Sequence, residues 1–191
     1  MSVVEQKSEL DPWRATSDQS KFLDGIYANC AKEMAAFWFS LRDEFGRPNH
    51  SQTTGRKFGS TNCDVFILDC SVPGKLLAVD IGDGAKELLG EIRENDDLVK
   101  IMQRRGKARS LCFANEVAET GCVIHEIHHR QTAFEQDFIV ERLMFPLFDG
   151  DGRVTEIFGM VTGCDGNRED FAMSSEVETE VITFDPMWDN R

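Results

Sequence analysis

The sequence predicts an α+β domain, in which one antiparallel sheet carries helices packed on one face. Two groups of short β-prone runs, at residues 63–81 and 121–164, support this prediction. Three helical segments lie between the two groups, at residues 85–92, 96–104 and 110–117. Strands that gather at both ends of a domain, with helices inserted between them, are typical of an α+β fold and not of an alternating α/β fold.

Length and charge restrict the class of protein. The chain of 191 residues, 41% of them hydrophobic, can bury one core, and this length favours one domain with extensions over two domains. Its formal net charge of −13 repels phosphate backbones and anionic lipid. Residues 1–14 lack the basic start and apolar stretch of a signal peptide, and no apolar run approaches the ~18 residues of a membrane span. We therefore expect a soluble, cytoplasmic protein with no nucleic-acid or membrane partner.

The N-terminal third of the sequence predicts a mobile arm, a long helix and a linker. Residues 1–19 are polar and show no periodicity, which is typical of a mobile arm. Apolar residues then recur at intervals of three and four over residues 20–45, the spacing of one helical face. Gly46 and Pro48 end this predicted helix, and the polar stretch that follows, up to residue 62, is typical of a linker.

The strand-like runs are bounded by turn residues. Residues 63–70 and 75–81 are separated by a Val-Pro-Gly turn and predict a hairpin. Residues 121–129, 137–148 and 153–164 predict three further strands, the last two joined by an Asp-Gly-Asp-Gly turn. Beyond these strands the chain becomes acidic and irregular, and we expect a C-terminal tail with one apolar docking segment.

The cysteines show no close pairs of the kind that a structural zinc site requires. Their apolar or strand-like surroundings predict buried free thiols. A redox pair stays open, because the sequence does not say which sulfur atoms lie close together. The six cysteines are Cys30, Cys63, Cys70, Cys112, Cys122 and Cys164.

Three segments of the chain carry a family resemblance. Residues 37–48 (FWFSLRDEFGRP) combine aromatic residues on a helix with a loop that contains proline. Residues 76–90 (LLAVDIGDGAKELLG) form a strand, a glycine turn and a helix that ends in Leu-Gly. Residues 141–159 (ERLMFPLFDGDGRVTEIFG) form a closing hairpin. In this order and spacing the segments resemble the PAS domain family, and in particular a bacterial group of stand-alone or terminal PAS domains.

The resemblance implies an α+β, PAS-like five-stranded antiparallel sheet with short helices on one face and a long N-terminal helix. It divides the chain into a mobile arm (1–19), an N-terminal helix with its linker (20–62), a PAS-like domain (63–164) and an acidic tail (165–191). PAS domains sense, dimerise or bind partner proteins and catalyse nothing by themselves. We therefore expect a non-catalytic cytoplasmic sensor or interaction module that signals through a partner protein or as a homodimer.

The resemblance also implies that the sheet and its helices either enclose a small-molecule ligand or pack solid. Inward-facing strand residues would line such a pocket, although alternation alone does not say which face is inward. No residue pattern in the sequence requires a cofactor, so its identity is left unknown. The candidate lining residues are Phe66, Leu68, Leu143, Phe145, Phe158 and Met160.

One string in the sequence matches a catalytic pattern. His125, Glu126 and His129 satisfy H-E-x-x-H, which binds zinc in metallopeptidases when both histidines lie on one face of a helix. The surrounding residues instead alternate at period two, which predicts a strand. On a strand the two histidines would lie about 13 Å apart, too far to share a metal. We therefore expect these histidines to lie on a strand and to be solvated. A zinc metallopeptidase that uses this string is the alternative function.

The long helix offers a candidate partner surface. Phe37, Trp38 and Phe39 are consecutive and span about 200° of the helix circumference. One stripe packed against the sheet cannot readily bury all three. We therefore expect one aromatic to remain outside and to contact a second copy or a protein partner. The alternative is that the helix caps the sheet and the N-terminal arm covers the remainder.

Overall fold

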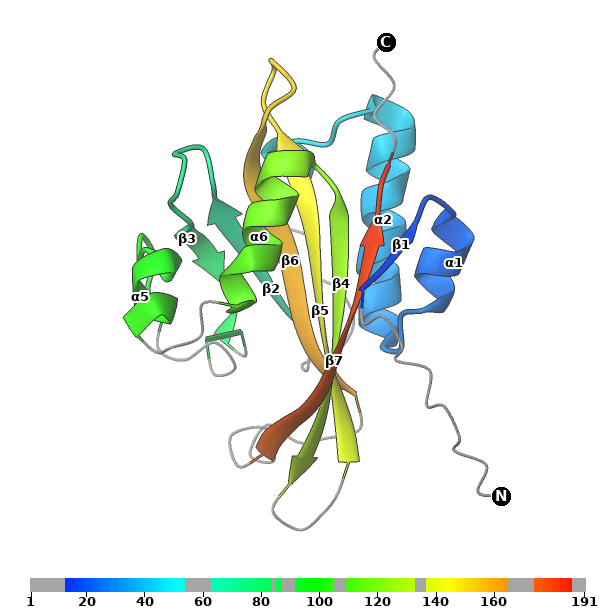
Figure 1. Cartoon of the computed structure of the whole chain (residues 1–191). Helices are drawn as coiled ribbons and strands as arrows, with labels where there is room; N and C mark the ends of the chain where they lie inside the picture. The colour runs from blue at the N-terminus through cyan, green and yellow to red at the C-terminus, as the bar shows by residue number, and fades with distance from the viewer. Residues whose placement is uncertain are drawn as a thin grey trace, which may run out of the picture.

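The structure is a computed structural model that describes residues 13–53, 63–83, 85–86, 92–104, 109–132, 137–164 and 174–186. In this part of the chain one sheet runs through the molecule, and helices cover both of its faces (Figure 1). The strands follow the order β1-β7-β4-β5-β6-β2-β3. They are β1 (Trp13–Thr16), β2 (Cys63–Asp69), β3 (Leu77–Ile81), β4 (Val123–Thr132), β5 (Asp137–Phe148), β6 (Val154–Cys164) and β7 (Ser174–Phe184).

The five predicted strands are consecutive neighbours in the sheet, from β3 at one edge to β4. Strands β3, β2, β6, β5 and β4 are neighbours in that order, and every pair among them is antiparallel. Helices α5 (Leu98–Arg104) and α6 (Arg109–Thr120) lie on one face of this unit. The fold is therefore PAS-like, as the sequence predicted.

Two further strands extend the sheet beyond the prediction. Strand β7 pairs antiparallel with β4, and β1 pairs parallel with β7. Residues 13–16 and 174–184, placed by the sequence in a mobile arm and an irregular acidic tail, thus form strands, and the docking segment expected in that tail lies in β7. Val181 and Phe184 of β7 are buried, so the segment gains from apolar burial despite its charge. Its acidic residue Glu180 lies 3.2 Å from His129 of β4, which explains how an acidic stretch can pair with this edge.

The predicted long helix is divided into two helices. Helix α1 (Gln19–Asp24) ends at Gly25, and α2 (Asn29–Phe45) begins after an extended Ala28. The single helix over residues 20–45 was therefore wrong in its continuity. The break has a physical cause, because Glu141 on β5 accepts the backbone N–H groups of Tyr27 and Ala28. The predicted end of the helix is confirmed by Gly46, which has a φ of 77°.

The sheet separates two hydrophobic cores. On one face, α1 and α2 pack through Phe22, Met34, Trp38 and Phe39. On the other face, α5 and α6 pack over side chains of β2, β4, β5 and β6. Figure 1 shows these helix pairs on opposite sides of the strands. The expectation of helices on one face holds for the short helices, while α1 and α2 cover the opposite face.

The loop after α2 is fastened to the hairpin between β5 and β6. Arg47 stacks 5.7 Å from the ring centroid of Phe148, and the Phe148 N–H donates to the carbonyl of Pro48 at 2.8 Å. Gly152 has a φ of 78°, and a Cβ there would meet the Arg47 guanidinium. The glycine is therefore needed both for the turn and for the close approach of Arg47.

Among the described cysteines, two differ from the predicted buried free thiols. Cys70, Cys112 and Cys122 form no disulfide, as expected, but Cys112 is exposed. Cys30, in the first turn of α2, is disulfide-bonded, so the free-thiol prediction was wrong there. The sequence could not show this, because a disulfide depends on a distance between residues far apart in the chain.

Several predictions fall on residues outside the described ranges. Most of the helix at 85–92 and the second half of the linker up to residue 62 belong to this group. The described part of the chain has one further helix, α3 (His50–Thr53), in the first part of that linker. None of the described helices combines the length and the apolar character needed to cross a membrane.

Candidate functional site

An apolar cavity lies between the sheet and helices α5 and α6. Its volume is about 30 Å³, room for about one or two water molecules and far less than an aromatic ring needs. Of the nine described residues that line it, eight have hydrocarbon or thioether side chains, and Arg142 is the exception. The lining residues are Phe66, Leu68, Leu76, Leu98, Met102, Leu111, Ala114, Arg142 and Met144.

Arg142 is held in the cavity wall by Glu126. The two residues are opposite one another on β5 and β4. The Arg142 Nε and Nη2 atoms both donate to Glu126 Oε2, Nε at 3.0 Å. The Glu126 side chain is fully buried, and that of Arg142 is 11% exposed. A buried arginine in an apolar wall is costly unless an acid is paired with it, and Glu126 supplies that charge.

Two further residues orient the Glu126 carboxylate. His128 Nε2 lies 2.9 Å from Glu126 Oε2, and Thr179 Oγ1 on β7 lies 3.2 Å from His128 Nδ1. A carboxylate can only accept, so His128 donates through Nε2. The other oxygen, Glu126 Oε1, has no hydrogen-bond partner among the described residues. All the donors therefore converge on one oxygen.

Glu126 is ionised in this arrangement. Burial raises the pKa of Glu126, but the Arg142 charge and the His128 hydrogen bond outweigh burial, and the pKa lies below its ordinary value of 4.5. The Glu126–Arg142 pair thus has one full negative and one full positive charge. Its net charge is zero at neutral pH.

The predicted pocket residues are divided between the two faces of the sheet. Phe66 and Leu68 on β2 line the cavity. The other four, on β5 and β6, lie in the opposite core beneath α2. Those four are Leu143, Phe145, Phe158 and Met160. The prediction could not separate the faces, because the strands of this sheet are apolar on both sides.

A second buried acid lies beneath α2. Glu141 on β5 and His125 on β4 are both fully buried, and His125 Nε2 is 2.8 Å from Glu141 Oε1. The Tyr27 N–H donates to Glu141 Oε1 at 2.8 Å and the Ala28 N–H donates to Oε2 at 2.7 Å. Glu141 therefore anchors the start of α2 to the sheet. This is a structural contact and not part of the cavity.

The H-E-x-x-H string is a strand, as its period-two pattern predicted. His125 and His129 point to the α2 side of β4, whereas Glu126 points to the cavity side. Each histidine contacts a different glutamate, Glu141 for His125 and Glu180 for His129. The zinc site of a metallopeptidase needs both histidines on one helix face, so the strand conformation of this string contradicts the metallopeptidase alternative. Of the histidines expected to be solvated, His125 is fully buried, whereas His128 and His129 are partly exposed.

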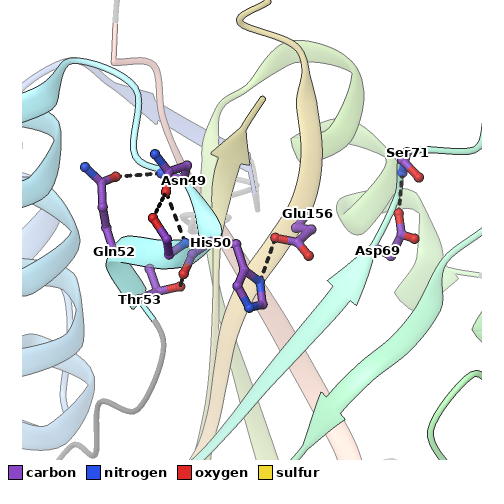
Figure 2. A network of polar contacts seen from close by, with 8 residues as sticks. Asn49, His50, Gln52, Thr53, Asp69, Ser71 and Glu156 are labelled. Carbon is purple, nitrogen blue, oxygen red and sulfur yellow. Dashed lines mark hydrogen bonds and ion pairs between the residues drawn. The ribbon is translucent and has the colours of Figure 1, made fainter. Parts of the chain in front are cut away.

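A third polar network lies where α3 meets the sheet. His50 Nδ1 is 2.9 Å from Glu156 Oε2 on β6 (Figure 2). On α3 itself, the Thr53 hydroxyl donates to the His50 carbonyl at 2.9 Å. His50 is therefore paired with an acid. The network tethers α3 to β6.

The candidate partner aromatics are mostly buried. Trp38 and Phe39 are 0% and 1% exposed. The Trp38 Nε1–H donates to the carbonyl of Pro146 on β5 at 3.1 Å. Phe37 is partly buried against the same core. One stripe of α2 thus buries two of the three aromatics, because the rings pack edge-on against one another and against Phe184.

Comparisons with known proteins give only distant structural likenesses. No family model and no curated protein matches the chain. Among solved structures, it is similar to an RNA-binding light-oxygen-voltage receptor (14% identity, 60% of this chain, 32% of that chain, TM-score 0.38). It is also similar to a Rhodobacter sphaeroides LOV protein (12% identity, 53% of this chain, 59% of that chain, TM-score 0.39). A third similar structure is a sensory box histidine kinase of Vibrio cholerae (8% identity, 71% of this chain, 98% of that chain, TM-score 0.42).

These likenesses carry no argument about function. The chain spans less than two thirds of the length of the first two structures. All three TM-scores lie below 0.5. The PAS-like assignment therefore depends on the strand order and the position of the helices, and the function depends on the site.

The sequence reasoning missed Glu126, Arg142 and Glu141 as buried charges. One signal was present, because each is next to an apolar residue within a largely apolar strand. Charged residues inside strands that are apolar on both faces indicate buried pairs, since an unpaired charge is costly there. The partner of each acid cannot be identified without the strand register. In the structure Glu126 is directly opposite Arg142, and His125 is opposite Leu143, two residues along β5 from its partner Glu141.

Proposed function

We propose that this protein is a non-catalytic PAS-type sensor module that binds a small molecule between the sheet and helices α5 and α6. The observation that supports the proposal best is the cavity, which is apolar apart from the paired Arg142. A small number of placed polar groups in an apolar cavity is typical of ligand sites. At about 30 Å³ the cavity must widen to admit a ligand, and such a change would move α5 or α6.

The proposed output is contact with a protein partner or a second copy through the region of α2. Phe37 is the one member of the predicted cluster that retains some exposure, and Tyr27 and Phe45 at the ends of α2 are about half exposed. The rest of the outward face, including Lys32, Glu33 and Glu44, is polar or charged and exposed. A transient interface suits such a surface better than an obligate one.

We place the module in the cytoplasm as part of the same proposal. The free thiols of Cys70, Cys112 and Cys122 are consistent with a reducing compartment. In that compartment the Cys30 disulfide would respond to the thiol pool. Fractionation of the native source with an antibody checks this placement, and recovery in a membrane or secreted fraction would contradict it.

Native mass spectrometry of freshly purified protein tests the sensor proposal, together with its absorption spectrum. We expect a non-covalent mass increment that disappears on denaturation. Ala114 lines the cavity and is 4% exposed, so Ala114→Leu fills the space and should remove the increment. A wild type that carries nothing and gains nothing from a cell extract would overturn the ligand half of the proposal.

A further inference from the structure

Arg142, in the cavity wall, has hydrogen-bonding capacity that Glu126 does not use. Its Nε and Nη2 atoms are engaged by Glu126, whereas Nη1 has no acceptor among the described residues. The guanidinium has five N–H donors in a planar fork. The remaining donors are therefore not used by Glu126, and among the described residues that line the cavity Arg142 has the one polar side chain.

The charge of this donor is already balanced. Glu126 is fully buried beside it, and no second acid among the described residues is paired with Arg142. His128 contacts the same Glu126 oxygen and is itself held by Thr179. A carboxylate entering the cavity would thus add an uncompensated negative charge to an apolar space, which is costly.

We propose that the cavity selects a neutral, largely apolar molecule with one hydrogen-bond acceptor, such as a ketone or an ester, and that Arg142 donates to this acceptor. Glu126 acts as the positioning residue that holds Arg142 and excludes anionic ligands. This inference rests on the proposed sensor function, because it assumes that the cavity opens to a ligand. It adds the ligand class and the two residues that set it.

The cavity has one adaptable side and one fixed side, so a small ligand could enter through a local movement of α5. Leu98 and Met102 belong to α5, a helix of 7 residues, and both side chains line the cavity. Methionine is unbranched and adapts readily to a changed volume. The sheet side, by contrast, is fixed by Phe66, whose ring packs directly on Gly159 of β6. We therefore expect α5 to move and the sheet to stay in place.

Three small probes of similar shape test the selectivity. Cyclopentanone offers a neutral acceptor, methylenecyclopentane replaces its oxygen with a CH₂ group, and cyclobutanecarboxylate offers an anion. The methyl resonances of Met102 and Met144, both cavity residues, report binding at the site. We expect cyclopentanone to bind about tenfold more tightly than methylenecyclopentane, because the hydrogen bond has a charged donor. Cyclobutanecarboxylate should bind no better than the hydrocarbon.

Two variants separate the roles of the pair. In Glu126→Gln the Arg142 charge is no longer balanced, so the preference should reverse in favour of cyclobutanecarboxylate. That variant can fold poorly, since it leaves a buried charge unpaired. The double variant Glu126→Gln/Arg142→Met removes both charges, and it should bind cyclopentanone and methylenecyclopentane equally.

The outcomes distinguish this inference from the sensor proposal. If methylenecyclopentane binds the wild type as tightly as cyclopentanone, the cavity accepts ligands but the acceptor selectivity is wrong. If cyclobutanecarboxylate is the best ligand of the wild type, the neutral class is wrong. If none of the three probes shifts the methionine methyls up to its solubility limit, both the inference and the ligand half of the sensor proposal fail.

Discussion

Glu141 shows how one buried side chain can fix the position of a helix. Its two oxygens accept from His125 and from the backbone of Tyr27 and Ala28, at the point where α1 ends and α2 begins. Backbone N–H groups at a helix start lack partners within the helix, and a carboxylate there also interacts favourably with the helix dipole. Glu141 thereby joins β5, β4 and α2 in one contact.

We expect Glu141→Gln to lower the free energy of unfolding by about 3 kcal/mol, because it removes a buried charge that accepts several hydrogen bonds. The amide also places an NH₂ group where only donors approach. Urea unfolding followed by circular dichroism measures the change. Glu44→Gln on the exposed face of α2 is the matched control and should change the value by less than about 0.5 kcal/mol. Equal effects of the two substitutions would contradict the anchoring role.

The two buried acids also predict the pH dependence of stability. Burial raises the pKa of Glu141, but the contacts with His125, Tyr27 and Ala28 outweigh burial, and the pKa lies below its ordinary 4.5. The pKa of Glu126 is lowered as well. Groups with a lowered folded pKa stabilise the fold fully above the unfolded value, and this contribution is lost as the pH falls through the folded value.

The protein should therefore keep its stability from neutral pH down to about 5 and lose it progressively below about 4.5, where the unfolded chain takes up protons first. The free energy of unfolding measured at several pH values between 7 and 3 checks this. In Glu141→Gln the acid loss should be smaller than in the wild type, because one of the two groups is gone. A steeper acid loss in that variant would show that another group dominates.

At the scale of elements, the period-two alternation predicted the strands more accurately than the helical spacing predicted the long N-terminal helix. The period-two pattern around His125 correctly predicted β4, and the Asp-Gly-Asp-Gly turn correctly predicted the hairpin of β5 and β6. The helical pattern over residues 20–45 missed the break after Gly25, because the break depends on Glu141, far away in sequence. The docking segment expected in the C-terminal tail lies in β7, with Val181 and Phe184 buried, but its acidic surroundings gave no strand-like pattern from which to predict the pairing with β4.

The contact between β2 and β6 gives a prediction at this scale. The Phe66 ring lies over Gly159, and a Cβ at Gly159 would come within 2.1 Å of the ring. Gly159→Ala must displace Phe66 from the cavity wall, and we expect a loss of stability of at least about 2 kcal/mol from overpacking. The melting temperature measured by thermal unfolding should fall, and cyclopentanone should bind less tightly.

Gly150, in the exposed β5–β6 turn, is the control for this substitution. A Cβ at Gly150 would meet no heavy atom within 4 Å. Gly150→Ala should therefore leave the melting temperature nearly unchanged. A melting temperature of Gly159→Ala equal to that of wild type would mean that the ring can move without cost, and the rigid sheet side of the cavity would then be wrong.

At the scale of the molecule, one pair of strands serves both cores. Strands β4 and β5 present Glu126 and Arg142 to the cavity face, and they present His125 and Glu141 to the α2 face. Residues that alternate along the same strands thus belong to two networks on opposite faces. A displacement of β4 against β5 would disturb both, so the sheet offers a physical connection between the cavity and the helix proposed to contact a partner.

The net charge of −13 makes a prediction about self-association. Two copies that meet through α2 bring together like-charged chains, and the exposed acids on that helix, such as Glu33 and Glu44, add to the repulsion. Salt screens such repulsion, with a Debye length of about 10 Å at 0.1 M and about 3 Å at 1 M. If the protein forms a homodimer, its dissociation constant should fall as the salt concentration rises.

Sedimentation velocity at 50, 150 and 500 mM sodium chloride over a range of protein concentrations measures this dependence. Phe45, which is 52% exposed at the end of α2, provides the variant, and Phe45→Glu should weaken the dimer at every salt concentration. Val72→Glu is the matched control, because Val72 is 45% exposed in the turn between β2 and β3, away from α2. A dimer that weakens with salt would indicate complementary ion pairs. A wild type that stays monomeric in 500 mM salt would overturn the homodimer and leave a different protein as the partner.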